Sequence, residues 1–221
     1  MRAIFVTATG TGIGKTYITA ALARYFTEQK KSVRVLKPVL SGFDPANFPG
    51  TDPAILLQAI GRQPALAEIE KVSPFRYRAP LAPSQAAAKE GRTVDFGAIV
   101  KACRDAMNAD GDLLLIEGIG GLMVPLDGSR TVLDLIGALD IPLLLVTGSY
   151  LGTISHTLTA VEVAKSRKLA IRAVAISETP ESTVSLDDTA AAIAQFASLP
   201  IAVIPRGGGN SPAVARLAEL L

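Results

Sequence analysis

The sequence contains little of what disulfide-stapled, membrane-spanning or metal-cluster proteins depend on. Cys103 is its only cysteine, so an internal disulfide and a cysteine-based metal cluster are both excluded. Tryptophan is absent and aromatic residues make up only 5% of the chain, so the hydrophobic core must be aliphatic. A lone cysteine fits a reducing compartment, and we therefore expect a cytoplasmic protein.

Long hydrophobic runs and a strong excess of one charge are also missing. No apolar stretch reaches the roughly 18 to 20 residues that a membrane-spanning helix needs, and the run at 4–6 is far too short for a signal peptide. The formal net charge is +2, and the lysines and arginines are scattered along the chain. The sequence therefore predicts neither nucleic acid nor a membrane as a partner.

Aliphatic residues, by contrast, are abundant and regularly placed. The chain has 221 residues, of which 49% are hydrophobic, and we expect one domain over 1–221 with a substantial core. Short aliphatic runs alternate with segments that carry apolar residues at helical spacing. Most runs lack polar alternation, which is typical of strands buried on both faces of a parallel sheet. The runs lie at 4–6, 33–36, 113–116, 143–146, 173–176 and 201–204. The pattern predicts an α/β fold, a doubly wound and mostly parallel sheet with helices on both faces.

Two proline-containing stretches, 42–52 and 73–84, are predicted to be surface loops.

The segment from Gly10 to Thr16 has the residues of a phosphate-binding loop. It follows the first predicted strand and opens a helix, which is the context that a P-loop requires. Glycines let backbone N–H groups point at phosphate oxygens, Lys15 supplies a positive charge, and the Thr16 hydroxyl can ligate Mg²⁺. The strict pattern has glycine at position 9, where this chain has Thr9. The segment is therefore interpreted as a variant P-loop that binds a nucleoside triphosphate, which makes the predicted fold a P-loop NTPase type.

Two further charged residues end predicted strands. Glu117 closes the run at 113–116 and precedes a glycine-rich turn, where a carboxylate is placed to hold Mg²⁺. Lys37 closes the run at 33–36, where an ammonium group is costly unless an anion or solvent balances it. Glu117 is therefore predicted to contribute to the nucleotide site, and Lys37 either faces a bound anion or is a solvated lysine at a strand end.

Several motifs, in this order, resemble those of the dethiobiotin synthetase family. They are Thr9 to Thr16, Lys37 to Gly42, Thr51-Asp52, the proline loop Pro80 to Pro83, Ile116 to Gly121, and Leu151 to His156. The resemblance covers residues 1–160, and the later residues match only loosely. It implies an ATP-dependent cyclo-ligase of biotin biosynthesis. This enzyme would join CO₂ to 7,8-diaminononanoate through a carbamate and a carbamic-phosphoric anhydride, giving dethiobiotin, ADP and phosphate.

The resemblance also implies roles for individual residues. Lys15 and Lys37 would stabilise charge on the phosphates and the carbamate, and Thr11 and Ser41 would orient the carbamate or diamine. Mg²⁺ would be held by Thr16, Asp52 and Glu117. The nucleotide would contact residues 12–17 and 118–120, namely Gly12, Ile13, Gly14, Lys15, Thr16, Tyr17, Gly118, Ile119 and Gly120. The substrate would be bound by Thr11, Lys37, Ser41, Gly118, Gly152, Thr153 and Ser155. A homodimer is implied, in which Leu151 to Ser155 of one subunit approaches the substrate carboxylate in the other.

The expected base pocket is where the chain departs most from the family. Ser177 stands where many members have an asparagine that reads the adenine, and Pro205, Arg206 and Gly207 are expected to complete the pocket. Serine has a shorter reach and lacks the amide group. We therefore expect ATP as the phosphoryl donor but loose selectivity for the base, so that other nucleoside triphosphates also serve.

Three alternative functions compete with this interpretation. A partition or positioning ATPase of the deviant P-loop class would carry an additional lysine five residues before Lys15, where this chain has Gly10. A cobyrinate-type ligase usually carries an amidotransferase domain with a catalytic cysteine, whereas Cys103 lies on a predicted apolar helical stripe. A nucleotide-binding scaffold without catalytic activity is the third. His156, the only histidine, is expected to be a hydrogen-bonded structural residue.

Overall fold

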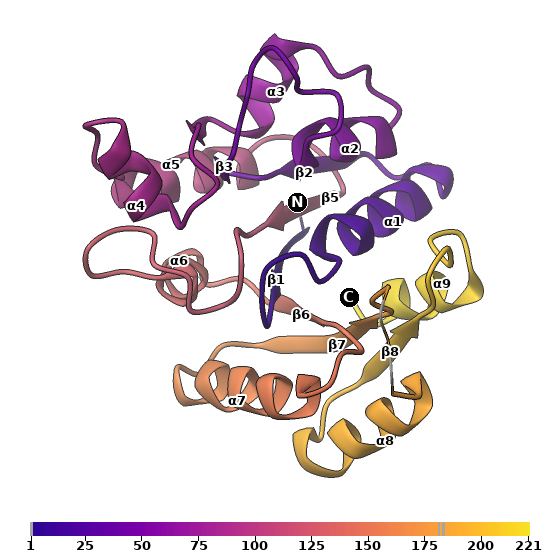
Figure 1. The fold of residues 1–221 in the computed structure, drawn as a ribbon. Helices are drawn as coiled ribbons and strands as arrows, with labels where there is room; N and C mark the ends of the chain where they lie inside the picture. Colours follow the sequence, from indigo (N-terminus) through magenta and orange to yellow (C-terminus); the bar gives the residue numbers. More distant parts are fainter. Residues whose placement is uncertain (1, 181, 183) are drawn as a thin grey trace.

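The computed structural model describes residues 2–180, 182 and 184–221. Its main sheet has six parallel strands in the order β2-β5-β1-β6-β7-β8 (Figure 1). These are β1 (Arg2–Ala8), β2 (Val33–Leu36), β5 (Leu113–Glu117), β6 (Leu143–Thr147), β7 (Ile171–Ser177) and β8 (Ile201–Ile204). Each contains one of the six predicted aliphatic runs, so the predicted strands are confirmed.

Helices cover both faces of this sheet because successive residues of each buried strand are apolar and point to opposite faces. On β1, Ile4 and Val6 belong to one core cluster, whereas Phe5 belongs to the other. The first cluster is covered by α1 (Lys15–Glu28), α2 (Asp52–Ala59), α3 (Leu66–Val72) and α9 (Pro212–Glu219). The second is covered by α4 (Pro83–Lys89), α5 (Phe96–Met107), α6 (Val132–Leu139) and α7 (Thr153–Ser166). The helix α8 (Leu186–Ala197) packs beside α7 and β8. The doubly wound α/β architecture is therefore confirmed (Figure 1).

The prediction of an irregular loop over 73–84 is wrong in part. Within it, β4 (Phe75–Tyr77) pairs in parallel with β3 (Val39–Ser41) to form a second, two-stranded sheet, and α4 begins at Pro83. Prolines flank β4 on both sides, and its hydrogen-bonding partner lies far earlier in the chain, so local patterning misses it. The other predicted loop, 42–52, is irregular up to the start of α2 at Asp52.

The lone cysteine is part of the core, as predicted from its helical stripe. Cys103 is fully buried on α5, and burial raises the pKa of its thiol to about 12. It is therefore an inert packing residue at neutral pH. Across the described ranges, the structure contains no helix that is both long and apolar enough to cross a membrane.

Candidate functional site

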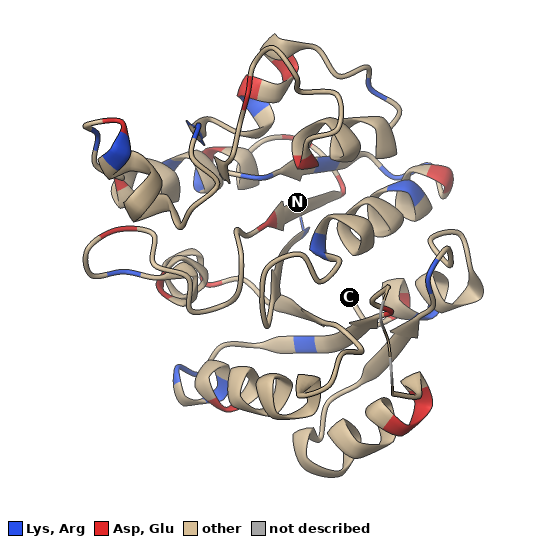
Figure 2. Ribbon diagram, in the orientation of Figure 1, with Lys and Arg blue, Asp and Glu red and all other residues tan. Residues whose placement is uncertain are grey.

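Three charged segments meet at one edge of the main sheet because of its strand order. The parallel strands β2, β5 and β1 are neighbours, so their carboxyl ends lie side by side. Lys37 follows β2, Glu117 ends β5, and the predicted P-loop follows β1. Figure 2 shows a basic segment at the start of α1 facing acidic segments at the end of β5 and the start of α2. The sheet thus gathers residues that are far apart in the sequence.

The predicted P-loop occupies the turn between β1 and α1. Gly12 and Gly14 have φ values of 72° and 98°, in the left-handed region that favours glycine. Gly14 is the residue before α1, so the first N–H groups of the helix open toward the loop. The buried Lys15 ammonium donates to the carbonyl of Gly10 at 3.1 Å. Burial, reinforced by the nearby charge of Lys37, lowers the pKa of Lys15 to about 8.

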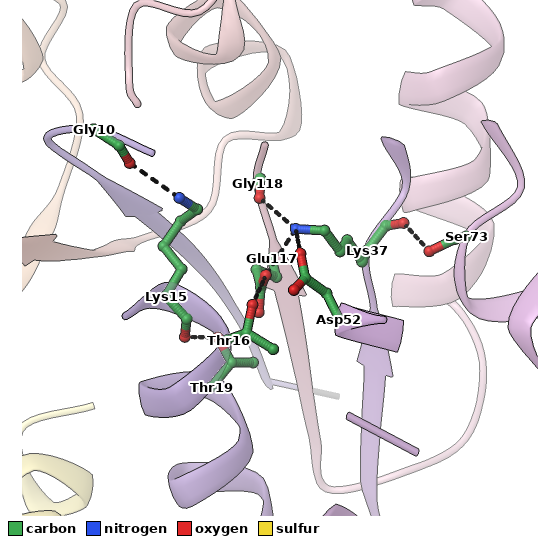
Figure 3. Close-up of polar contacts among 9 residues, drawn as sticks. All are labelled: Gly10, Lys15, Thr16, Thr19, Lys37, Asp52, Ser73, Glu117 and Gly118. Atoms are coloured by element: carbon green, nitrogen blue, oxygen red, sulfur yellow. Dashed lines mark hydrogen bonds and ion pairs between the residues drawn. The ribbon is translucent and has the colours of Figure 1, made fainter. Parts of the chain in front are cut away.

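Lys37 is buried between two carboxylates (Figure 3). Its ammonium donates to Glu117 Oε1 at 2.7 Å and pairs with Asp52 Oδ2 at 2.9 Å. A third contact reaches the carbonyl of Gly118 at 3.2 Å, so all three of its protons are used. Burial opposes the charge on Lys37, but Glu117 and Asp52 outweigh it and hold its pKa above the usual value. Burial also opposes the charge on Asp52, and there the ammonium of Lys37 outweighs it and holds the pKa low.

The other oxygen of Glu117 has no hydrogen-bond partner, although it is buried. The first oxygen accepts from both Lys37 and the Thr16 hydroxyl, the latter at 2.8 Å. Among the described residues, no group of three or more His, Cys, Asp or Glu side chains gathers to hold a metal. A hydroxyl and two carboxylates nevertheless supply the hard oxygen ligands that Mg²⁺ prefers, with substrate phosphates and water completing the shell. Thr16, Asp52 and Glu117 therefore fit a magnesium ion.

A cavity of about 360 Å³ lies over these groups. Thr11, Lys15, Thr16, Lys37, Ser41 and Asp52 all line it, together with Gly12, Gly14, Tyr17, Leu40, Ile119 and Gly120. Most of the residues predicted to bind phosphate, metal and carbamate are thus brought together. Gly118 lies outside this lining, and its carbonyl accepts from Lys37.

A second cavity of about 420 Å³ adjoins the first along Gly12, Gly14 and Tyr17. Its other lining residues are Ile13, Ser177, Glu178, Thr179, Pro180, Arg206 and Gly207. Three of the predicted base-pocket residues therefore line it. Pro205, the fourth, is exposed and lies outside this lining. The two cavities together offer a path from the phosphate loop to the end of β7.

Ser177 lies directly behind the P-loop. A Cβ atom added to Gly14 would stand 2.3 Å from the Ser177 hydroxyl, so this position of the loop must be glycine. Beside it, Glu178 accepts from the backbone N–H of Arg206 at 2.7 Å. Glu178 was not among the predicted site residues, because only the folded chain brings the β8 end against the β7 end.

The predicted substrate-binding residues of α7 lie outside both cavities of the described structure. Leu151 is 84% exposed, and Gly152 and Ser155 are exposed as well. Thr153 is buried, and its hydroxyl donates to the carbonyl of Gly148. The His156 ring nitrogen hydrogen-bonds Tyr150 at 2.9 Å, which confirms its predicted hydrogen-bonded state. A ligand contact to the exposed residues of α7 therefore has to come from outside these two cavities.

Solved structures with a similar fold include two MinD proteins. The MinD cell division protein of Aquifex aeolicus matches with a TM-score of 0.55 and 14% identity, covering 98% of this chain and 86% of that one. A septum site-determining MinD complexed with Mg-ADP, from Pyrococcus horikoshii, matches with a TM-score of 0.55 and 18% identity, covering 99% and 94%. At such low identity these structures support the fold alone, which is the predicted doubly wound α/β sheet.

Sequence relatives are much closer. A family model described as an AAA domain matches residues 2–207. The ATP-dependent dethiobiotin synthetase of Methylobacterium nodulans is 44% identical over 215 residues, which covers 95% of each chain. The enzyme of the same name from Caulobacter sp. is 48% identical over 210 residues, covering 94% of this chain and 89% of the relative. With the phosphate loop, the buried lysine and the paired carboxylates at one sheet edge, the chain belongs to the ATP-dependent dethiobiotin synthetase family.

Proposed function

We propose that the chain is an ATP-dependent dethiobiotin synthetase that acts on 7,8-diaminononanoate, CO₂ and ATP. The observation that carries the proposal is Lys37, buried against Asp52 and Glu117 on the wall of the phosphate-loop cavity. A positioning ATPase of the deviant P-loop class would carry its second lysine within the loop, where this chain has Gly10, whereas Lys37 follows a different strand. Phosphorylation of a carbamate is served by the phosphate loop and Lys37 together, because several negative charges must be held close to one another.

The chemistry has three steps. One amine of the diamine adds to CO₂ and loses a proton to form a carbamate. A carbamate oxygen then attacks the γ-phosphorus of ATP, and ADP leaves. The second amine attacks the carbonyl of the mixed anhydride, the bond to phosphate breaks, and the amine loses its proton as the cyclic urea closes. Neither a nucleophilic side chain nor a catalytic histidine takes part, so the protein acts mainly by positioning and charge stabilisation.

Most residues of the first cavity have a role in this proposal, together with Glu117 and Gly118, which contact Lys37. Lys15 neutralises the phosphates once it releases the Gly10 carbonyl, and Lys37 faces the charge that develops between carbamate and γ-phosphate. Thr11 and Ser41 are at the cavity wall, where their hydroxyls orient the carbamate and diamine. Thr16, Asp52 and Glu117 would hold Mg²⁺, which when bound neutralises phosphate charge. Gly12 to Tyr17 and Gly118 to Gly120 contact the nucleotide.

The proposal includes a homodimer with the substrate site near the subunit interface. The segment from Leu151 to Ser155, which leads into α7 and is exposed except at Thr153 and Ile154, would reach the diamine carboxylate bound in the partner. Backbone N–H groups at a helix start suit a carboxylate. The position of this segment outside its own cavity supports a contribution in trans.

Dethiobiotin formation is the direct test. Purified protein is supplied with 7,8-diaminononanoate, bicarbonate and Mg-ATP, and the product is identified by mass. We expect a species with the mass of dethiobiotin, formed one for one with ADP. If the protein hydrolyses the nucleotide without forming this product, or hydrolyses it while binding to a polymer, the result would instead favour a positioning ATPase.

Loose base selectivity is the second expected result. Ser177 is 5% exposed behind the loop and offers the base only a hydroxyl. We expect kcat/KM for ATP, CTP and GTP to agree within about 100-fold, far less than the roughly 10⁴-fold discrimination of a fully hydrogen-bonded reading site. Ser177→Asn should sharpen the preference for ATP, whereas the exposed control Ser166→Asn should not. A strict ATP preference in the unaltered chain would contradict the assignment of position 177.

A further inference from the structure

Four threonine hydroxyls form a connected chain that begins at the phosphate loop. Thr9 Oγ1 lies 3.1 Å from Thr147 Oγ1, and Thr147 Oγ1 lies 2.8 Å from those of both Thr153 and Thr157. Thr9 opens the loop, Thr147 ends β6, and Thr153 begins α7. Thr147, Thr153 and Thr157 are buried. This threonine chain joins the loop to the first turn of α7 through the protein interior.

A count of the available protons fixes the direction of the threonine chain. Each hydroxyl has one proton to donate and two lone pairs to accept. Thr153 donates to the carbonyl of Gly148 at 2.8 Å, so Thr147 must be the donor to Thr153. Thr147 then has no proton left, and Thr9 must be the donor to Thr147. The single proton of Thr157 is shared between the Thr153 carbonyl, at 2.7 Å, and Thr147 Oγ1, at 2.8 Å. Thr147 is therefore the common hydrogen-bond partner of the loop and the helix.

The contacts of Thr9 determine how the first half of the loop is held. Its backbone N–H donates to the carbonyl of Val146 at 3.0 Å, next to the hydroxyl contact with Thr147. The Gly10 carbonyl is held by the Lys15 ammonium at 3.1 Å. A phosphate bound in the loop would compete with Gly10 for that ammonium. The anchor of Thr9 on β6 then keeps the start of the loop in place.

We propose that Thr147 is a positioning residue that fixes the phosphate loop relative to the first turn of α7. Loss of its hydroxyl leaves the Thr9 donor without its acceptor, so the loop is less well ordered before nucleotide binds. The part of the inference that concerns the diamine rests on the proposed function, in which the start of α7 meets the substrate. The part that concerns the nucleotide does not.

The test removes the hydroxyl while keeping its shape. For Thr147→Val, we expect the dissociation constant of ADP, measured by direct titration, to rise about five- to tenfold, the effect of one lost hydrogen bond. The KM for the diamine should rise as well, with a smaller change in kcat. Thr147→Ser restores the hydroxyl and should return the ADP affinity to within about twofold of the original. Thr9→Val removes the same hydrogen bond from the other side, so its dissociation constant for ADP should match that of Thr147→Val. The double variant should show no further loss of ADP affinity.

A matched control variant distinguishes a loss of loop positioning from a general loss of stability. Thr189 is another fully buried threonine, whose hydroxyl donates within α8 to the Ser185 carbonyl. Thr189→Val should lower thermal stability without changing ADP affinity. Unchanged ADP affinity in Thr147→Val and Thr9→Val, or failure of Thr147→Ser to restore it, would overturn the inference. If the unaltered chain makes no dethiobiotin while Thr147→Val still weakens ADP binding, the proposed function fails and the positioning role stands.

Discussion

Replacing Lys37 with alanine should remove most of the turnover, by at least about 10²- to 10³-fold, the usual loss for one charge-stabilising donor in a reaction. Lys37 lines the cavity beside the phosphate loop, and its three protons are already directed at Glu117, Asp52 and Gly118. No other buried ammonium except Lys15 lines this cavity in the described structure. The measurement is kcat for dethiobiotin formation with saturating diamine and nucleotide.

A stability measurement must accompany this variant, because Glu117 loses its main partner. Breaking a buried ion pair from one side costs on the order of 3–5 kcal/mol, so the free energy of unfolding should fall. The double variant Lys37→Ala/Glu117→Gln removes the unpaired charge and should recover much of that stability without recovering activity. Lys71→Ala is the control, since that side chain is 71% exposed and pairs with Glu68 at the surface. Retained turnover in Lys37→Ala would remove Lys37 from the catalytic residues.

Lys15 should make nucleotide affinity depend on pH above about 8. Its folded pKa of about 8 lies below the usual 10.5 because burial disfavours the charged form. The unfolded chain therefore binds more protons between these two values, and the unliganded fold gains stability as pH rises through that window. Phosphate binding requires the ammonium form. The dissociation constant of ADP should thus increase by up to about tenfold per pH unit above pH 8.

Two variants test the origin of that pH dependence. Lys15→Arg keeps a positive charge that does not titrate in this range, so its ADP affinity should be nearly flat with pH. Lys15→Met should bind ADP weakly at every pH and lose about 10²-fold or more in turnover. The measurement is ADP titration calorimetry between about pH 7 and 9.5, where proton linkage applies. A flat profile in the unaltered chain would mean that Lys15 stays charged throughout.

Local patterning was sufficient to locate the six strands of the main sheet and the charged residues, Lys37 and Glu117, that follow or end two of them. Buried parallel strands are continuous aliphatic runs, so the six runs could be found without knowing their neighbours. The loop from Gly10 to Thr16 is likewise encoded within a single strand–turn–helix unit. The weak strand β4 was missed because three residues between prolines carry too little local signal, and its pairing with β3 supplies the hydrogen bonds.

In the candidate site, too, local sequence signals identify some residues, whereas the contacts between them depend on the order of the strands. Lys37 and Glu117 could each be selected because a charge at the end of a buried strand is unusual. Their mutual contact could not, because it depends on β5 lying between β2 and β1. The pairing of Glu178 with the Arg206 backbone depends in the same way on β7 pairing with β8.

The sequence by itself determined the alternation of strands and helices, the phosphate loop, and the residue types that resemble one enzyme family. These features depend on the spacing of residues that are close in the sequence, because backbone sterics and side-chain burial act on such residues to form local structure. Only the tertiary structure decided that Lys37 lies between two carboxylates, that Ser177 lies behind Gly14, and that Thr147 links the loop to α7. Those contacts join residues from strands, loops and helices that are far apart in the sequence, and the order of the strands in the sheet is set by packing of the whole chain.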